Sequence, residues 1–172
     1  MVGLEPHLIL RTKRANEVER SPEKDTFGYV GNILFDRMAG ATIHTCTPGE
    51  YGRVGSKGLI DAVSENLGKN RKVYKIPVGG SNGIGTWGYI EAVDELMHQI
   101  DENDGAIDHV VFACGSGGTA AGIGLGLSLA YRQNSSIDNL PKIHAIGVCD
   151  YPDYFYDTIA SIAKEMGLDK RD

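Results

Sequence analysis

The chain has 172 residues, 41% of them hydrophobic, and a formal net charge of -6. This length can bury a core in one domain or two small lobes. The charges are scattered and form no basic stripe, which argues against nucleic acid and anionic membranes as partners. No stretch is long and apolar enough for a membrane span, so we expect a soluble, intracellular protein.

Apolar periodicity predicts strands and helices in alternation. The predicted strands cover 7–11, 41–45, 72–78, 107–113 and 143–148, and the predicted helices cover about 29–39, 56–70, 85–103, 118–133 and 155–167. The run at 107–113 is almost continuously apolar, which is typical of a strand buried on both faces of a parallel sheet. Charge, proline and glycine predict loops at 13–26 and 47–55. The alternation indicates an α/β fold with parallel strands.

The most informative motif is Cys114-Gly115-Ser116-Gly117-Gly118-Thr119, which joins the strand at 107–113 to a helix of small residues. A glycine turn that opens a helix directs several backbone N–H groups, and the positive end of the helix dipole, toward one point. The motif therefore predicts a site for a phosphorylated ligand.

A second glycine loop follows another predicted strand. Gly79-Gly80-Ser81-Asn82 comes directly after Ile76-Pro77-Val78. Ligands of open parallel sheets bind beyond the carboxyl ends of the strands, and glycine lets a backbone approach a ligand closely. A single loop of this type is about as often an ordinary turn between a strand and a helix as it is a binding site. Two such loops favour one shared pocket.

These two loops also carry a family resemblance. Together with Gly85-Thr86-Trp87-Gly88-Tyr89, they resemble segments of the D-cysteine desulfhydrase and 1-aminocyclopropane-1-carboxylate deaminase family, which belongs to the tryptophan-synthase-β-like, fold type II enzymes that use pyridoxal phosphate. Segments near His7–Arg11, Gly31–Arg37 and Val148–Asp153 resemble the family in the same order, so the resemblance covers nearly the whole chain.

The resemblance implies a parallel three-layer α/β fold of two lobes, with residues 1–70 in the smaller lobe and 71–172 in the larger, cofactor-phosphate-binding lobe. It implies a lyase or deaminase of small amino acids, most closely one that converts D-cysteine to pyruvate, sulfide and ammonia, and a homodimer in the full-length protein. The residues that it implies for binding pyridoxal 5'-phosphate are Gly115, Ser116, Gly117, Gly118, Thr119, Gly79, Gly80, Ser81 and Asn82.

The family's Schiff-base lysine lies in a segment that this sequence does not contain, so no catalytic residue is assigned. The resemblance accordingly indicates an internal fragment of a longer enzyme, inactive by itself, with exposed sheet edges and an uncovered apolar face. Its targeting segment would lie outside the sequence, which leaves a cytoplasmic or an organellar location open. Lys72 and Lys75 are interpreted as surface lysines rather than substitutes.

Several alternatives stay open on the sequence. The substrate of the parent enzyme could be the cyclopropane amino acid instead of D-cysteine, and the chain could be a non-catalytic fragment. Gly115-x-Gly117-x-x-Ala120, with Asp150 after the next strand, also satisfies a relaxed dinucleotide-binding fingerprint.

Three further features are interpreted as packing. His44 and Cys46 lie two residues apart without further ligands at metal-binding spacing, so no metal site is predicted. Cys114 has no partner base in the sequence. The aromatic residues at 151–156 are expected to pack the last helix onto the sheet.

Overall fold

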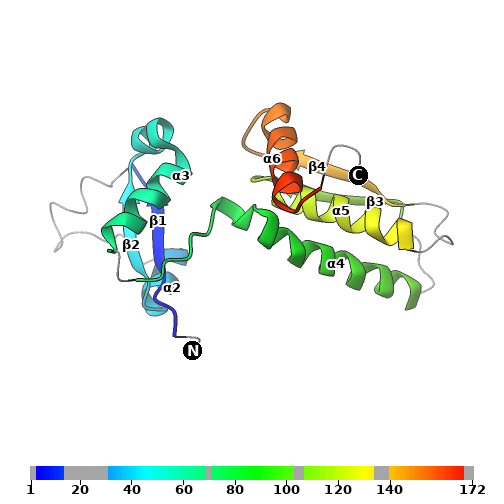
Figure 1. Ribbon diagram of the computed structural model, residues 1–172, viewed down its shortest axis with the longest axis horizontal. Helices are drawn as coiled ribbons and strands as arrows, with labels where there is room; N and C mark the ends of the chain where they lie inside the picture. Colours follow the sequence, from blue (N-terminus) through cyan, green and yellow to red (C-terminus); the bar gives the residue numbers. More distant parts are fainter. Residues whose placement is uncertain (1–2, 14–30, 69–70, 103–106, 134–139, 169–172) are drawn as a thin grey trace. The chain divides into compact units, whose positions relative to one another are not determined.

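The computed structural model describes residues 3–13, 31–68, 71–102, 107–133 and 140–168. The chain divides into two compact units, Met1–Lys75 and Ile76–Asp172 (Figure 1). The predicted lobe boundary at residue 70 lies near this division, and the assignment of the two units to a smaller and a larger lobe stays a prediction. None of the described helices is both long and apolar enough to cross a bilayer.

The first unit is a strand–helix–strand motif followed by a second helix. Its elements are β1 (His7–Arg11), α2 (Gly31–Met38), β2 (Thr42–Cys46) and α3 (Pro48–Asn66). β1 and β2 pair in parallel, with Leu8 opposite Ile43. Both strands and α2 lie where the sequence predicts them, whereas most of the loop predicted at 13–26 falls outside the described residues.

Helix α3 begins earlier than predicted, and the loop prediction for 47–55 is wrong. Thr47 and Glu50 form a capping box: the Thr47 hydroxyl accepts the Glu50 N–H at 3.2 Å, and the Glu50 carboxylate accepts the Thr47 N–H at 2.7 Å. Pro48 occupies the first turn, where no N–H donor is needed. The glycines disturb the helix only at Gly55, which has φ 74° and marks a kink.

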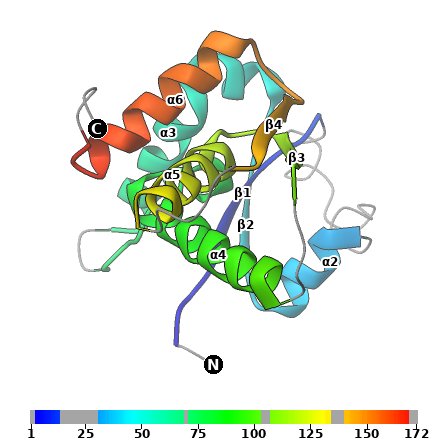
Figure 2. The same ribbon diagram turned by 90° about the vertical axis from the view of Figure 1, so that its right-hand side faces the viewer.

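The second unit contains a second parallel strand–helix–strand motif. Its elements are the short 3-10 helix η1 (Val78–Gly80), α4 (Gly83–Glu102), β3 (His109–Cys114), α5 (Gly118–Gln133), β4 (Lys142–Gly147) and α6 (Pro152–Glu165). β3 pairs with β4 in parallel, and Cys114 lies opposite Gly147 at the carboxyl end. Figure 2 shows α4 and α5 side by side, with α6 near the start of α5.

Glycines let α4 and α5 approach closely. A Cβ atom on Gly122 of α5 would overlap the Tyr89 Cβ of α4, and one on Gly126 would lie 2.8 Å from the Val93 Cβ. Val93 is accordingly almost fully buried, as are Leu127 and Ile162, which places the core of this unit between the helices. The small residues of α5 are therefore needed within the helix, where it packs against α4, and not only in the glycine-rich turn at its start.

Two strand predictions need correction. Residues 72–77 form no strand, because a strand needs a hydrogen-bonded neighbour and none of the described segments pairs with them. β3 is not buried on both faces, because Val111 is 65% exposed. Its neighbour β4 is exposed at every residue. The described sheet has only these two strands, so it offers too little surface for helices on both sides. The expected uncovered apolar face is thus observed.

The capping box yields a prediction for α3. Replacing Thr47 with Ala removes the hydroxyl that caps Glu50, and we expect a loss of about 1 kcal/mol of stability in the first unit. Hydrogen exchange of the first α3 amides and urea unfolding would measure this loss. Ser64→Ala, within the same helix, is the control and should be close to neutral.

The stability lost on replacing Thr47 with Ala should also depend on pH. Hydrogen bonds from the Thr47 backbone and hydroxyl hold the pKa of Glu50 below its ordinary value of 4.5. A carboxylate whose pKa is lowered on folding stabilises the fold above its unfolded pKa and loses that contribution as the pH falls through the folded value. The difference between wild type and Thr47→Ala should therefore be full at neutral pH and shrink below about pH 4.5. A difference that does not change with pH would contradict this account.

Candidate phosphate site at the start of helix α5

The loop between β3 and α5 is fixed from two sides. The Val148 N–H donates to the Cys114 carbonyl at 3.1 Å, and the Cys149 thiol donates to the Gly115 carbonyl at 2.9 Å. Gly117 has φ 85°, and a Cβ there would lie 3.0 Å from the Thr158 Cγ2 of α6. The turn thus needs glycine for both its backbone angle and its space.

The structure brings the two predicted glycine loops together. The Ser81 hydroxyl donates to the Ser116 hydroxyl at 2.8 Å and accepts the Gly118 N–H at 3.0 Å. A Cβ on Gly79, which has φ 67°, would overlap the Ser116 Oγ. The loops are therefore in direct contact, as expected for a shared site, although their predicted cofactor contacts stay a prediction.

The start of α5 offers hydrogen-bond donors to an anion. The first intrahelical bond runs from the Ala121 N–H to the Gly117 carbonyl at 3.0 Å, so the N–H groups of Gly118, Thr119 and Ala120 precede it. Ser81 takes the first of these. The N–H groups of Thr119 and Ala120 and the nearby Ser116 hydroxyl form a set of hydrogen-bond donors. Together with the positive end of the helix dipole, this donor set suits a phosphate group.

The start of α4, by contrast, is capped by the protein itself. The Gly83 N–H donates to the Glu165 carboxylate at 2.7 Å, and the Gly85 N–H donates to the Asn82 side-chain oxygen at 2.8 Å. A carboxylate already compensates the helix dipole there. The cap at Asn82 could have been read from the sequence, because asparagine before a helix is a frequent cap. The contribution of Glu165 could not, since it comes from the end of α6.

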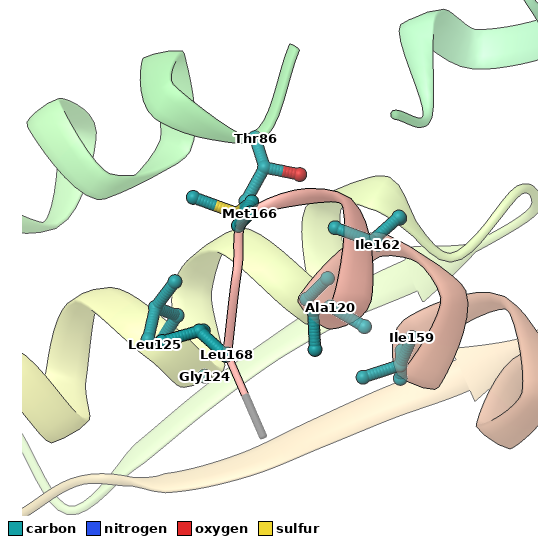
Figure 3. A pocket seen from close by; sticks show the side chains of 10 residues that line it. Thr86, Ala120, Gly124, Leu125, Ile159, Ile162, Met166 and Leu168 are labelled. Atoms are coloured by element: carbon teal, nitrogen blue, oxygen red, sulfur yellow. The ribbon is translucent and has the colours of Figure 1, made fainter. Parts of the chain in front are cut away.

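A cavity of about 180 Å³ lies between the three helices of this unit (Figure 3). All its lining residues are apolar except Thr86, whose hydroxyl donates to the Asn82 carbonyl at 2.9 Å. The lining is formed by Thr86, Ala120, Ala121, Gly124, Leu125, Ile159, Ile162, Ala163, Met166 and Leu168. Such a lining offers no donors to an anion, so this cavity is not the phosphate site.

The two lysines considered as substitutes lie on the surface. The Lys75 ammonium contacts the Asp61 carboxylate of α3 at 2.6 Å, and this hydrogen bond lowers the pKa of Asp61. Lys72 is exposed. Neither is held in an apolar environment of the kind that favours a neutral, nucleophilic amine.

The other sequence candidates have mixed outcomes. The His44 and His7 rings are hydrogen-bonded at 3.0 Å between Nε2 and Nδ1, and burial raises the pKa of the Cys46 thiol. Among the described residues, no group of three or more potential ligands could hold a metal ion. Of the aromatic residues at 151–156, Phe155 packs against Gly147 of β4, whereas Tyr151 and Tyr156 are largely exposed, so the packing prediction is only partly right.

Residues 15–171 match the family of pyridoxal-phosphate dependent enzymes. The chain belongs to this family. It is 43% identical over 176 aligned positions to an Arabidopsis thaliana bifunctional D-cysteine desulfhydrase/1-aminocyclopropane-1-carboxylate deaminase, mitochondrial, with 99% of this chain and 41% of that protein aligned. A Thermotoga maritima putative 1-aminocyclopropane-1-carboxylate deaminase is 43% identical over 79% of the chain and 41% of its own length. A Serratia proteamaculans D-cysteine desulfhydrase is 33% identical over 67% of the chain and 37% of its own length.

Membership in this family confirms the resemblance seen in the sequence and favours pyridoxal phosphate over a dinucleotide as the cofactor. The chain spans about two fifths of the length of these relatives. The parallel α/β architecture agrees with the expected fold class. The donor set at the start of α5 also fits the phosphate group of this cofactor.

Gly79 and Gly88 give a matched test of the loop contact. Gly79→Ala places a methyl group against Ser116 at positive φ, so we expect a loss of about 1–3 kcal/mol and faster hydrogen exchange at the Gly118 amide. Gly88 lies in α4 with open space around it, and Gly88→Ala should stabilise the unit by up to about 1 kcal/mol. Equal effects of the two substitutions in urea unfolding would contradict the loop geometry.

Proposed function

We propose that the protein is a pyridoxal-phosphate-dependent lyase of small amino acids that releases sulfide and ammonia from D-cysteine and leaves pyruvate. Family membership and the names of the Arabidopsis and Serratia relatives support this activity. The observation that carries the proposal is the contact between the two glycine loops at the start of α5, where Ser81 joins Ser116 and Gly118.

In this proposal the chain supplies the hydrogen-bond donors that hold the cofactor phosphate, which we call the phosphate grip. The N–H groups of Thr119 and Ala120 and the Ser116 hydroxyl donate to phosphate oxygens, and the α5 dipole adds a favourable field. The loop at Gly79–Asn82 contacts these donors through Ser81. When bound, the cofactor supplies an electron sink for bonds at the substrate α-carbon, while the protein orients it and excludes competing reactions.

No lysine of the described chain is proposed to form the covalent link to the cofactor. Lys75 is paired with Asp61, and Lys72 is exposed. Binding by this chain then depends on phosphate and ring contacts. The covalent anchor would come from a segment equivalent to the family's lysine segment.

A second candidate activity is deamination of 1-aminocyclopropane-1-carboxylate. The name of the Thermotoga relative supports it, as does the double name of the Arabidopsis protein. Both activities would use the same phosphate grip, because they differ in the groups that contact the substrate.

The proposal includes a homodimer of the full-length protein, a small amino acid as the substrate, and a cytoplasmic or organellar location. The mitochondrial location in the name of the Arabidopsis relative supports an organelle. Scattered charge and the net charge of -6 support the absence of nucleic-acid partners.

Cofactor binding can be tested on the chain itself. Pyridoxal 5'-phosphate should bind at least about tenfold more tightly than pyridoxal, because charge-assisted hydrogen bonds contribute about 1.5–3 kcal/mol each. Fluorescence titration would give both affinities, and inorganic phosphate should compete. Ser128→Ala, an exposed change on α5, is the control and should leave the ratio unchanged. Equal affinity for the two compounds would rule out the phosphate grip.

The substrate can be tested with a chimera. In the Arabidopsis relative, the aligned 41% would be replaced by this chain, and the products formed from D-cysteine, L-cysteine and 1-aminocyclopropane-1-carboxylate would be assayed. We expect sulfide release from D-cysteine. Ammonia from the cyclopropane substrate alone would favour the second activity. A folded chimera that binds the cofactor but acts on none of the three would contradict the proposal.

A further inference from the structure

The hydrogen bonds between the glycine loops have a defined direction. The Gly118 N–H can only donate, so the Ser81 oxygen must accept it at 3.0 Å. The Ser81 proton is then directed to the Ser116 oxygen at 2.8 Å. Because Ser116 accepts this bond, its own proton is directed away from Ser81 and can be donated to another acceptor. The series therefore ends in a donor, the Ser116 hydroxyl.

The surrounding backbone is built to admit the Ser81 side chain. A Cβ on Gly118 would lie 2.5 Å from the Ser81 Oγ, and one on Gly79 would overlap the Ser116 Oγ. The η1 turn fixes Ser81 from its other side, since the Asn82 N–H donates to the Gly80 carbonyl at 3.0 Å. Glycine at these positions thus lets one hydroxyl lie between the two loops.

We infer that Ser81 is a positioning residue for the cofactor phosphate: its hydroxyl orients Ser116 as a donor and does not itself contact the phosphate. This inference rests on the proposed function and assigns Ser81 a role different from that of a direct ligand. The bond from Gly118 also polarises the series, which strengthens the donor at its end. A phosphate oxygen is the acceptor that such a donor suits at a helix N-terminus.

A double-mutant cycle separates this role from a direct contact. Ser81→Ala, Ser116→Ala, the double variant and wild type would be titrated with pyridoxal 5'-phosphate and with pyridoxal, and the ratio of the two affinities compared. Each single substitution should lower the ratio about tenfold, and the double variant should match Ser116→Ala. Pyridoxal affinity should change little, which a merely destabilised fold would not give.

Two further measurements guard against a folding artefact. Ser81→Cys keeps the side-chain shape but places a larger, weaker hydrogen-bonding atom there, so its ratio should fall between wild type and Ser81→Ala. Ser128→Ala should match wild type. In both Ser81 variants, the amide proton resonance of Gly118 should shift even without ligand, because that N–H loses or weakens its acceptor.

The outcomes are distinct. Additive losses in the double variant would show that Ser81 contacts the phosphate directly and would overturn the inference. An unchanged ratio for Ser81→Ala would also overturn the inference. A higher ratio would overturn it too, since it would mean that the Gly118 N–H binds phosphate better without Ser81. Wild type that binds both compounds equally would reject the proposed function and this inference together, whereas loss of coupling alone would reject only the inference.

Discussion

The contact on which the candidate site depends is the Ser81 hydroxyl, held between the start of α5 and the loop that precedes α4. A hydroxyl both accepts and donates, so it satisfies the Gly118 N–H and still directs a proton to Ser116. Neither loop could reach the other if it carried a side chain at Gly79 or Gly118. The glycines are therefore required by this one interaction as much as by the backbone angles of the turns.

The two helix starts of the second unit show how the same local feature has two uses. α4 begins at Gly83, whose N–H is taken by the Glu165 carboxylate, so its dipole is already compensated. α5 begins at Gly118, whose N–H donates to the neutral hydroxyl of Ser81; among the described residues, no carboxylate hydrogen-bonds to this N–H group. A negative ligand gains most where no protein anion competes, which singles out α5.

Helix packing and sheet exposure explain the remaining character of this unit. Gly122 and Gly126 allow α4 and α5 to pack closely, so the buried side chains, such as Val93, lie between helices rather than against the strands. β3 and β4 keep apolar side chains exposed, Val111 among them. Surface of this kind normally packs against further polypeptide. The described part of the chain does not provide it.

Sequence alone determined the parallel α/β alternation, the glycine loop that joins β3 to α5 and the family, because these depend on local periodicity, glycine spacing and long motifs. The sequence also contained the residues of the capping box at Thr47, although the proline and glycines that follow Thr47 made that segment resemble a loop. Tertiary structure alone decided that residues 72–77 form no strand, since a strand exists only where a neighbour pairs with it. It likewise decided that Ser81 meets Ser116 across 35 positions of sequence, because such a contact is set by the packing of whole elements and leaves no local signal.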